Sequence, residues 1–517
     1  MTFEIVFVLL SLLGMMAALI ADKMRPAMVL FSVVVLFLCV GILTPKEMLE
    51  GFSNKGMITV ALLFLVSEGI RQSGTLGQVI KKLLPQGKTT VFKAQLRILP
   101  SVAFISAFLN NTPVVVIFAP IIKHWAKSVK LPATKFLIPL SYVTILGGIC
   151  TLIGTSTNLV VHGMILEAGY EGFTMFELGK VGIFIAIAGI IYLFIFSKRL
   201  LPDARPDTAV PDEEVEEGEK LHRVEAVLGA RFPGINKKLS DFNFQRHYGA
   251  EVKEIKTRNG QRYVDHLEDV VLREGDTLVV MADDTFIPTW GESSVFVLLT
   301  NGNDPDTSGK KKRWLALILL VLMIVGATVG ELPATKEMFP DIKLDMFFFV
   351  CITTIIMAWT NIFPARKYTK YISWDILITI ACAFAISKAM VNSGVADCVA
   401  GFIIGLSDDY GPHVLLAILF VITNLFTELI TNNAAAALAF PLALSISAQL
   451  GVSPTPFFVV ICMAASASFS TPIGYQTNLI VQGIGNYKFT DFVRIGLPLN
   501  IITFLISVIL IPLIWNF

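Results

Sequence analysis

Long apolar runs separated by short polar segments occupy most of the chain. Ten runs are near the length that crosses about 30 Å of hydrocarbon; they cover residues 3–20, 27–43, 57–72, 135–162, 180–197, 314–330, 343–361, 375–391, 455–485 and 494–515. Two further apolar segments, 97–120 and 412–445, carry clusters of Asn and Thr. We interpret these two as re-entrant hairpins, because broken polar backbone at membrane depth is tolerated only against protein or a water-filled cavity. The pattern predicts a polytopic α-helical membrane protein.

The apolar pattern occurs twice, with an offset of about 320 residues. Residues 150–163 and 470–483 are identical at eight of fourteen positions. The tripeptides 110–112 (Asn-Asn-Thr) and 431–433 (Thr-Asn-Asn) form a second pair at an offset of 321. Duplicated apolar halves, interrupted by small polar residues at matching points, are typical of secondary transporters. Such halves build one binding site between them, near the middle of the bilayer.

Charge predicts the orientation of the halves. With five crossings and one hairpin in each half, and the central polar segment in the cytoplasm, the inward loops hold 22 Lys and Arg and the outward loops hold five. Positive charge is expected to gather on cytoplasmic loops. Because five is an odd number, the two halves have opposite orientations, and the repeat is inverted. Hydrophobic residues make up 54% of the chain and charged residues 16%, which excludes an ordinary soluble protein.

The central segment, residues 200–309, has a different composition. Residues 203–220 are acidic and contain Pro, which predicts a linker. Alternation over 250–256 and an apolar run at 277–281 predict strands, with turn signals at 259–260 and 273–276. A turn at 232–235 is expected to lead into a short helix near 239–244. We predict a small α+β domain, with its core at about 221–285, between membrane repeats at 1–199 and 310–517.

The order of these central elements, and the sequence of residues 272–280, resemble the C-terminal subdomain of RCK proteins, the regulators of potassium conductance and transport. The resemblance covers roughly residues 221–285. It implies that the domain pairs with a second copy. It also implies either a small regulatory ligand, such as a nucleotide, at the paired surface, or a purely structural dimer clamp.

The membrane halves resemble the divalent anion:sodium symporter family. The tripeptides 110–112 and 431–433 are similar to that family's paired Ser-Asn-Thr motifs, and residues 154–158 and 474–478 are similar to its paired Gly-x-Pro-Pro-Asn breaks. The resemblance covers residues 1–199 and 314–517, and the RCK-like insert points to the branch related to sulfate permeases. It implies an ion-transporter-superfamily-like fold, a homodimer in a bacterial inner membrane with the central domain in the cytoplasm, and an elevator motion coupled to sodium.

A divalent anion at membrane depth needs hydrogen-bond donors and positive potential, without a fixed charge that would trap it. Side-chain amides, hydroxyls and the N-termini of broken helices meet this need. The predicted substrate-binding residues are Asn110, Asn111, Thr112, Thr155, Thr431, Asn432, Asn433 and Gln476. Oxygen ligands for sodium are predicted from Leu109, Asn111, Gly154, Thr427, Ile430, Asn432 and Gly474. The predicted helix-break or coupling residues are Thr157, Asn158, Thr477, Asn478 and Glu428.

Other functions are disfavoured by the sequence. It contains no His and carboxylate metal cluster, no Ser/His/Asp set and no phosphate loop, so we do not predict an enzyme, and we expect no nucleic acid partner. An RCK-gated channel would need a continuous pore lined by a symmetric filter. Tyr475 and Gln476 depart from the Gly-x-Pro-Pro-Asn motif of the symporter family, and the tripeptides 110–112 and 431–433 depart from its Ser-Asn-Thr motif. These departures argue against a dicarboxylate as the first candidate. We therefore expect a sodium-coupled symporter of a small divalent anion, with sulfate as the first candidate and a dicarboxylate such as succinate or citrate as the alternative.

Overall fold

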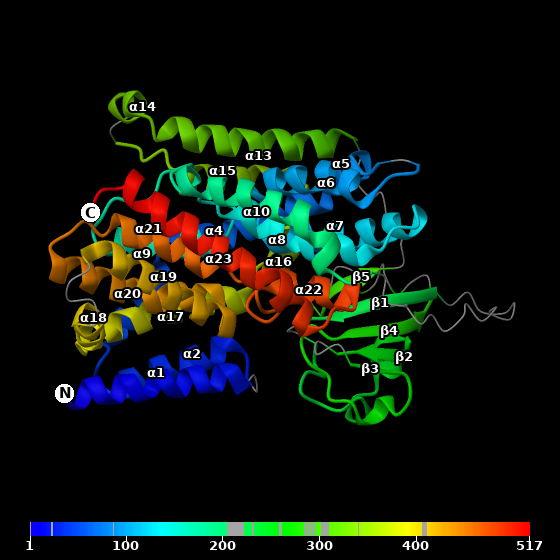
Figure 1. Ribbon diagram of the computed structural model, residues 1–517, viewed down its shortest axis with the longest axis horizontal. Helices are drawn as coiled ribbons and strands as arrows, with labels where there is room; N and C mark the ends of the chain where they lie inside the picture. Colours follow the sequence, from blue (N-terminus) through cyan, green and yellow to red (C-terminus); the bar gives the residue numbers. More distant parts are fainter. Residues whose placement is uncertain are drawn as a thin grey trace, which may run out of the picture.

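The computed structural model of the chain describes residues 2–21, 24–85, 87–203, 222–229, 232–257, 261–283, 286, 290, 295–300, 310–339, 341–405 and 411–517. Two sets of helices lie side by side along one direction, and a small sheet lies beyond one end of them (Figure 1). The predicted turn at 259–260, and the predicted linker apart from Asp203, lie outside the described residues.

The helices of the first repeat follow the predicted apolar runs. They are α1 (Phe3–Ala21), α2 (Pro26–Val40), α3 (Pro45–Glu50), α4 (Lys55–Gln72), α5 (Thr75–Leu83), α6 (Val91–Ser106), α7 (Asn111–Ser128), α8 (Leu137–Gly148), α9 (Ser156–Glu167) and α10 (Gly179–Leu200). The run at 135–162 is interrupted between α8 and α9. The short amphipathic helix α5 was not predicted, because it falls in a polar segment.

The second repeat has the same order of helices. They are α13 (Lys310–Gly330), α14 (Pro333–Met338), α15 (Met346–Trp359), α16 (Tyr368–Tyr371), α17 (Trp374–Asn392), α18 (Val395–Gly405), α19 (Gly411–Leu429), α20 (Asn432–Leu450), α21 (Thr455–Ser466), α22 (Gln476–Gly485) and α23 (Phe489–Ile514). Thus α4 corresponds to α17, the hairpin α6–α7 to α19–α20, and the broken pair α8–α9 to α21–α22.

Helices of the two repeats end in matching left-handed residues. The pairs and their φ angles are Gly41 (83°) with Asn361 (51°), Gly74 (71°) with Gly394 (76°), and Lys130 (57°) with Gly451 (66°). Members of each pair lie 320 or 321 positions apart in the sequence. A left-handed residue just beyond a helix is a common way to end it. The two repeats therefore share their backbone turns even where the side chains differ.

The repeats run in opposite directions (Figure 1). The chain begins with α1 and ends with α23 at one end of the molecule, whereas α10 ends and α13 begins at the other end, beside the sheet. The repeats also exchange their outer helices. The helix α2 packs against α17 of the second repeat, and α15 packs against α4 of the first. The inverted duplication predicted from the sequence is confirmed.

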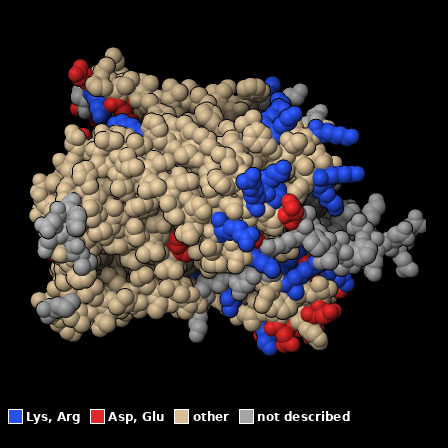
Figure 2. All heavy atoms as spheres, in the orientation of Figure 1, with Lys and Arg blue, Asp and Glu red and all other residues tan. Residues whose placement is uncertain are grey.

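The outer surface of the helices is suited to lipid. Within the described ranges, eight helices are long and apolar enough to cross a membrane. Large apolar side chains such as Leu10, Leu13 and Ile187 are 63%, 62% and 52% exposed. Figure 2 shows a wide band with few charges over the helices, with most of the visible Lys and Arg side chains towards the end that carries the sheet. The fold class predicted from the sequence, a polytopic helical membrane protein, is confirmed.

The central segment forms a five-stranded sheet in the order β3-β2-β4-β1-β5, in which all neighbouring strands are antiparallel. The strands are β1 (His222–Leu228), β2 (Glu251–Lys256), β3 (Arg262–Tyr263), β4 (Thr277–Ala282) and β5 (Phe296–Thr300). The strands expected at 250–256 and 277–281 are β2 and β4. The helix expected near 239–244 is a 3-10 turn at Leu239–Asp241 followed by α11 (Phe244–Tyr248). Phe232, Phe244, Tyr248 and Phe296 pack in the core of the domain.

Candidate functional site

Each hairpin tip ends where a new helix begins. The first tip runs from Ala107 to Asn110 and leads into α7, and the second passes through Ile430 and Thr431 into α20. Neither N-cap residue, Asn110 or Thr431, caps its helix with a side-chain hydrogen bond. The first N–H groups of both helices therefore lack that capping partner, and such ends carry positive partial charge.

The two breaks are held by matching hydrogen bonds. Asn158 Nδ2 donates to the carbonyl of Thr151 at 2.9 Å, and Asn478 Nδ2 donates to the carbonyl of Thr471 at 3.2 Å. Both asparagines reach back seven residues to the loop that precedes their own helix. This geometry gives Asn158 and Asn478 the role of fixing the breaks. Their further role in coupling stays a prediction.

The loop threonines also tie each break to the neighbouring tip. The Thr151 hydroxyl donates to the carbonyl of Ala107, and the Thr471 hydroxyl donates to the carbonyl of Glu428 at 3.0 Å. Sequence reasoning did not single out Thr151 and Thr471. The signal was present, because the two are identical residues at the 320-residue offset.

Three oxygen atoms surround the amide of Asn111 at the first tip. The amide nitrogen lies 2.8 Å from the Ser106 hydroxyl, 3.0 Å from the Thr144 carbonyl oxygen and 3.2 Å from the Gly154 carbonyl oxygen, in the amide orientation that lets it donate to them. In this orientation Asn111 Oδ1 accepts from the Tyr475 hydroxyl. Of the predicted sodium ligands, Asn111 and Gly154 are brought together here.

The second tip repeats this arrangement. The Thr427 hydroxyl donates to Asn432 Oδ1 at 2.8 Å and lies 2.5 Å from the carbonyl oxygen of Ala465. A Cβ atom on Gly474 would lie only 2.3 Å from the Thr427 carbonyl oxygen, so this approach of the break to the tip requires glycine. Thr427, Asn432 and Gly474, three of the predicted sodium ligands, therefore lie close together. Leu109 and Ile430 are buried at the tips, and their roles as ligands stay predictions.

Side chains from the two repeats meet between these clusters. The Tyr475 hydroxyl contacts Asn111, lies 3.1 Å from the Thr155 hydroxyl, and interacts with the amide of Asn432. Tyr475 is only 8% exposed. Sequence reasoning noted its bulk, but the spacing of 364 residues between Asn111 and Tyr475 gave no sign of their contact.

The helix N-termini are paired across the repeats in the same way. The Thr112 hydroxyl donates to Gln476 Oε1 at 3.3 Å, which joins α7 to α22. At the related position, Asn433 Oδ1 accepts from the Thr157 hydroxyl at 3.2 Å, which joins α20 to α9. Thr477 accepts from Ser141 of α8 at 2.9 Å. Four helix N-termini thus converge, and the hydrogen bonds described between them come from neutral side chains.

Glu428 precedes the second tip and anchors the second break. Its carboxylate accepts from the backbone N–H groups of Ser470 and Thr471, each at 2.8 Å, and from Asn500 Nδ2 at 2.7 Å. The equivalent position in the first repeat is Ala107. The contacts described for Glu428 therefore hold loop and hairpin together. Its response to a cation stays a prediction.

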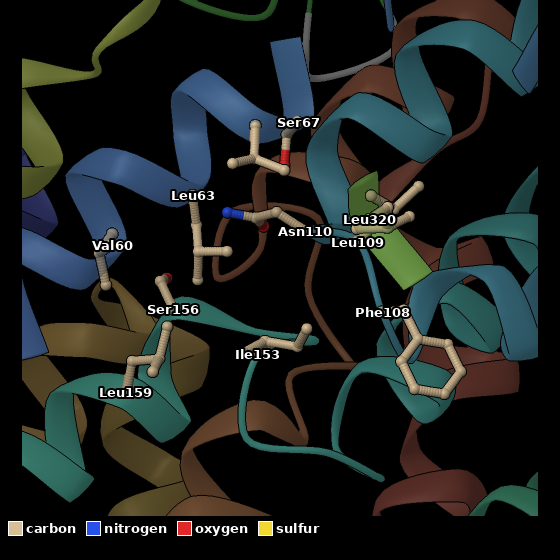
Figure 3. A pocket seen from close by; sticks show the side chains of 11 residues that line it. Val60, Leu63, Ser67, Phe108, Leu109, Asn110, Ile153, Ser156, Leu159 and Leu320 are labelled. Carbon is tan, nitrogen blue, oxygen red and sulfur yellow. The ribbon is translucent and has the colours of Figure 1, made fainter. Parts of the chain in front are cut away.

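A mainly apolar cavity adjoins the first tip (Figure 3). It lies between α4, the tip and the first break, and Leu320 of α13 reaches it. Its lining residues are Val60, Leu63, Val66, Ser67, Phe108, Leu109, Asn110, Ile153, Ser156, Leu159 and Leu320. The amide of Asn110 points into the cavity, towards Leu63 and Ser67 (Figure 3). The two neighbouring side chains therefore differ in their surroundings: Asn110 lines the cavity, whereas Asn111 contacts Tyr475.

Comparison with known proteins agrees with this architecture. The chain matches the model of the CitMHS family, described as citrate transporter, over residues 16–446 and again over 338–517. An uncharacterized transporter of Synechocystis is 30% identical over 94% of this chain and 93% of the relative. A Chlamydomonas reinhardtii protein named "Probable sodium/sulfate cotransporter 3" is 32% identical over 54% of this chain and 31% of the relative. A sodium-dependent dicarboxylate transporter of Staphylococcus saprophyticus is 25% identical over 28% of each chain.

Among the described residues, no group of three or more His, Cys, Asp and Glu side chains could hold a metal ion. The family model covers most of the chain, and the eight apolar helices are long enough to span a bilayer. The chain is an integral membrane protein that belongs to the citrate transporter family, CitMHS.

Proposed function

We propose that this protein is a sodium-coupled symporter of a small divalent anion, with sulfate as the best-fitting substrate. One observation carries the proposal: four helix N-termini from both repeats converge on neutral amides and hydroxyls. Helix N-termini offer N–H donors and positive potential, so they hold anions without a fixed cation. The hydrogen bonds described at this centre include none from Lys or Arg, and a cotransported cation would add the charge that the site lacks.

The two oxygen clusters support sodium as that cation. The hydroxyl of Ser106 and the carbonyl of Gly154 lie near the Asn111 amide, and Thr427 contacts Asn432, so amide, hydroxyl and carbonyl oxygens are close together at both tips. Hard cations prefer such ligands, and transporters often take them from unwound helices. Relatives in two organisms carry sodium in their names. Sodium bound beside the anion would make the binding of each dependent on the other.

The choice of sulfate is supported by the size of Tyr475. It is the counterpart of Thr155 in the first repeat, and its phenol extends to Asn111 and Thr155. This side chain fills space that a longer dicarboxylate or citrate would need, whereas a tetrahedral oxyanion is compact. The sulfate cotransporter name of one relative agrees with this choice. A dicarboxylate is the second candidate, because the family is described as citrate transporters and another relative is named for dicarboxylates.

An asymmetry between the repeats supports alternating access. The helix α4 packs along α9, but its counterpart α17 packs along α20. By the twofold relation, the counterpart of α9 is α22 and the counterpart of α20 is α7. Exchanging the two patterns gives a second arrangement, in which α17 packs along α22 and α4 packs more closely along α7. We infer that these two arrangements are the ends of an elevator movement of hairpins and broken helices past the remaining helices.

The central domain is proposed to be cytoplasmic and regulatory. Most Lys and Arg residues of the loops fall on its side of the membrane when the positive-inside rule is applied. A homodimer and a nucleotide at the RCK-like domain remain proposals that rest on resemblance.

Counterflow in proteoliposomes tests the proposed function. Vesicles loaded with sodium and unlabelled sulfate should accumulate labelled sulfate, and succinate should compete weakly. Replacing sodium with choline should stop uptake even when a pH gradient is imposed. Full uptake in sodium-free buffer driven by pH alone would contradict the proposal, and strong preference for succinate would select the second candidate.

A further inference from the structure

One face of α22, formed by Leu479 and Gly483, contacts the central domain. The turn before β4 lies against it: a Cβ atom on Gly275 would be 3.6 Å from Leu479 Cδ2. A Cβ atom on Gly483 would lie 2.5 Å from Thr277 Oγ1, so the turn packs closely against α22 at that position. Leu479 lies within one helical turn of Gln476. The domain therefore reaches close to the candidate site.

The equivalent face of α9 contacts a different partner. Leu159 and Gly163, the counterparts of Leu479 and Gly483, face the first turn of α4. A Cβ atom on Gly56 would lie 2.7 Å from the Leu159 carbonyl oxygen and 3.1 Å from Gly163 Cα. Asn54 Nδ2 also donates to the Gly163 carbonyl at 3.3 Å. In the first repeat, this face thus packs on the repeat's own α4.

The corresponding turn of α17 does not make this contact. The counterparts of Asn54 and Gly56 are Trp374 and Ile376. Because a Cβ atom on Gly56 would lie 2.7 Å from a backbone oxygen, Ile376 requires a wider spacing between α17 and α22 than that between α4 and α9. Trp374 is 46% exposed, and α17 packs along α20 rather than α22. The position that α17 would take on α22 is instead taken by the turn of the central domain.

We propose that the Leu479–Gly483 face of α22 is an interaction surface with two alternative partners in the same chain. Here it holds the Gly275–Thr277 turn, and in the second arrangement it holds the first turn of α17. The central domain is then a wedge that must leave α22 before the helices can move. This inference rests on the alternating-access movement of the proposed function. A signal that releases the domain would raise the rate of transport.

The docked state has one firm anchor and one poorly satisfied contact. Lys123 of α7 pairs with Glu225 of β1 at 3.0 Å, and Lys256 of β2 pairs with the same carboxylate at 3.3 Å. At the α22 contact, the hydroxyl of buried Thr277, which faces Gly483, has no hydrogen-bond partner among the residues that the structure describes. Buried polar groups without partners cost stability. Such a contact is suited to reversible docking.

A disulfide tests the wedge directly. A Cβ atom on Gly483 would lie 3.9 Å from Thr277 Cβ, within the range of a disulfide. Oxidation of the Thr277→Cys, Gly483→Cys double variant in proteoliposomes should reduce sodium-driven sulfate uptake to the level of empty vesicles, and a reductant should restore it. Each single-cysteine variant is the matched control. Unchanged uptake after the disulfide is verified by mass spectrometry would overturn the inference.

A second cysteine pair reports the movement without any transport assay. In the first repeat, a Cβ atom on Gly163 would lie 3.3 Å from Gly56 Cα. At the wider spacing that Ile376 imposes, a short thiol cross-linker should join Ile376→Cys to Gly483→Cys in the second arrangement. Adding Glu225→Gln, which weakens the anchor, should increase this cross-linking. No cross-link in either background, with or without sodium and sulfate, would also overturn the inference. If the protein takes up no sulfate but the cross-link still forms, the result would count against the proposed function and not against this inference.

Discussion

Lys123 on the arm of a hairpin donates to both carboxylate oxygens of Glu225 on the first strand of the central domain, at 3.0 Å and 3.2 Å. Burial of Glu225 raises its pKa, but the charges of Lys123 and Lys256 outweigh burial and lower the pKa from 4.5 to about 2. The carboxylate therefore favours its ionised form when the domain is docked.

The first prediction concerns this pair and pH. Because the folded pKa lies below the unfolded value, the ionised group stabilises the folded state fully above pH 4.5, and this stabilisation is lost as pH falls towards 2. A shift of this size corresponds to roughly 3 kcal/mol. Glu225→Gln should lower the thermal midpoint of the domain at pH 7, and the difference from the unmodified protein should shrink below pH 4.5.

Glu251→Gln is the matched control for this measurement. Glu251 pairs with Lys253, and both side chains are 54% exposed, so the pair should contribute little. Equal effects of the two substitutions in a melting curve would show that the buried pair does not hold the domain.

The second prediction concerns the tips. Asn111→Ala and Asn432→Ala should each abolish sodium-driven uptake, because each removes an amide from an oxygen cluster with few members. Asn392→Ala provides a control, since Asn392 bonds to Glu47 and the Ile42 carbonyl away from the tips. Uptake and size-exclusion profiles should be compared. Near-normal uptake by both tip variants would place the site elsewhere.

The third prediction concerns selectivity. Tyr475→Thr copies the residue of the first repeat and should admit succinate or citrate, so the ratio of dicarboxylate to sulfate uptake should rise. Tyr475→Phe keeps the bulk but removes the hydroxyl, so it should weaken sulfate uptake without admitting the larger anions. If both variants keep the selectivity of the unmodified protein, Tyr475 does not set substrate size.

The fourth prediction concerns the central domain as a whole. Replacing residues 221–285 by a flexible linker should leave a sodium-dependent carrier with altered, and by the wedge argument faster, transport. Initial uptake rates at equal protein density measure this. A variant that folds and dimerises but carries no substrate would show that the segment belongs to the transport machinery.

Duplication made much of this molecule predictable. The offsets of 320 and 321 residues identified the breaks and the hairpins, because polar residues in apolar runs recur at matching points, as in Asn111 and Asn432. Contacts across the repeats, such as Asn111 with Tyr475, could not be predicted from the sequence, because they depend on how the inverted halves pack. The contact of the central domain with α22 could not be predicted for the same reason, because it also depends on tertiary packing. Gly483 looks like one more small residue of a membrane helix until Thr277 is seen against it.

The four converging helix N-termini also have an electrical consequence. An N-terminus carries roughly half an elementary charge, so four of them amount to about two positive charges, which equals the charge of sulfate with opposite sign. In the proposed carrier, these partial charges would stabilise the bound anion, while the negative ends of the same helices keep the net charge of each dipole at zero. The charge that crosses the membrane would then be that of the sodium and sulfate ions alone, so voltage would act on loaded transport only if the number of sodium ions for each sulfate differs from two.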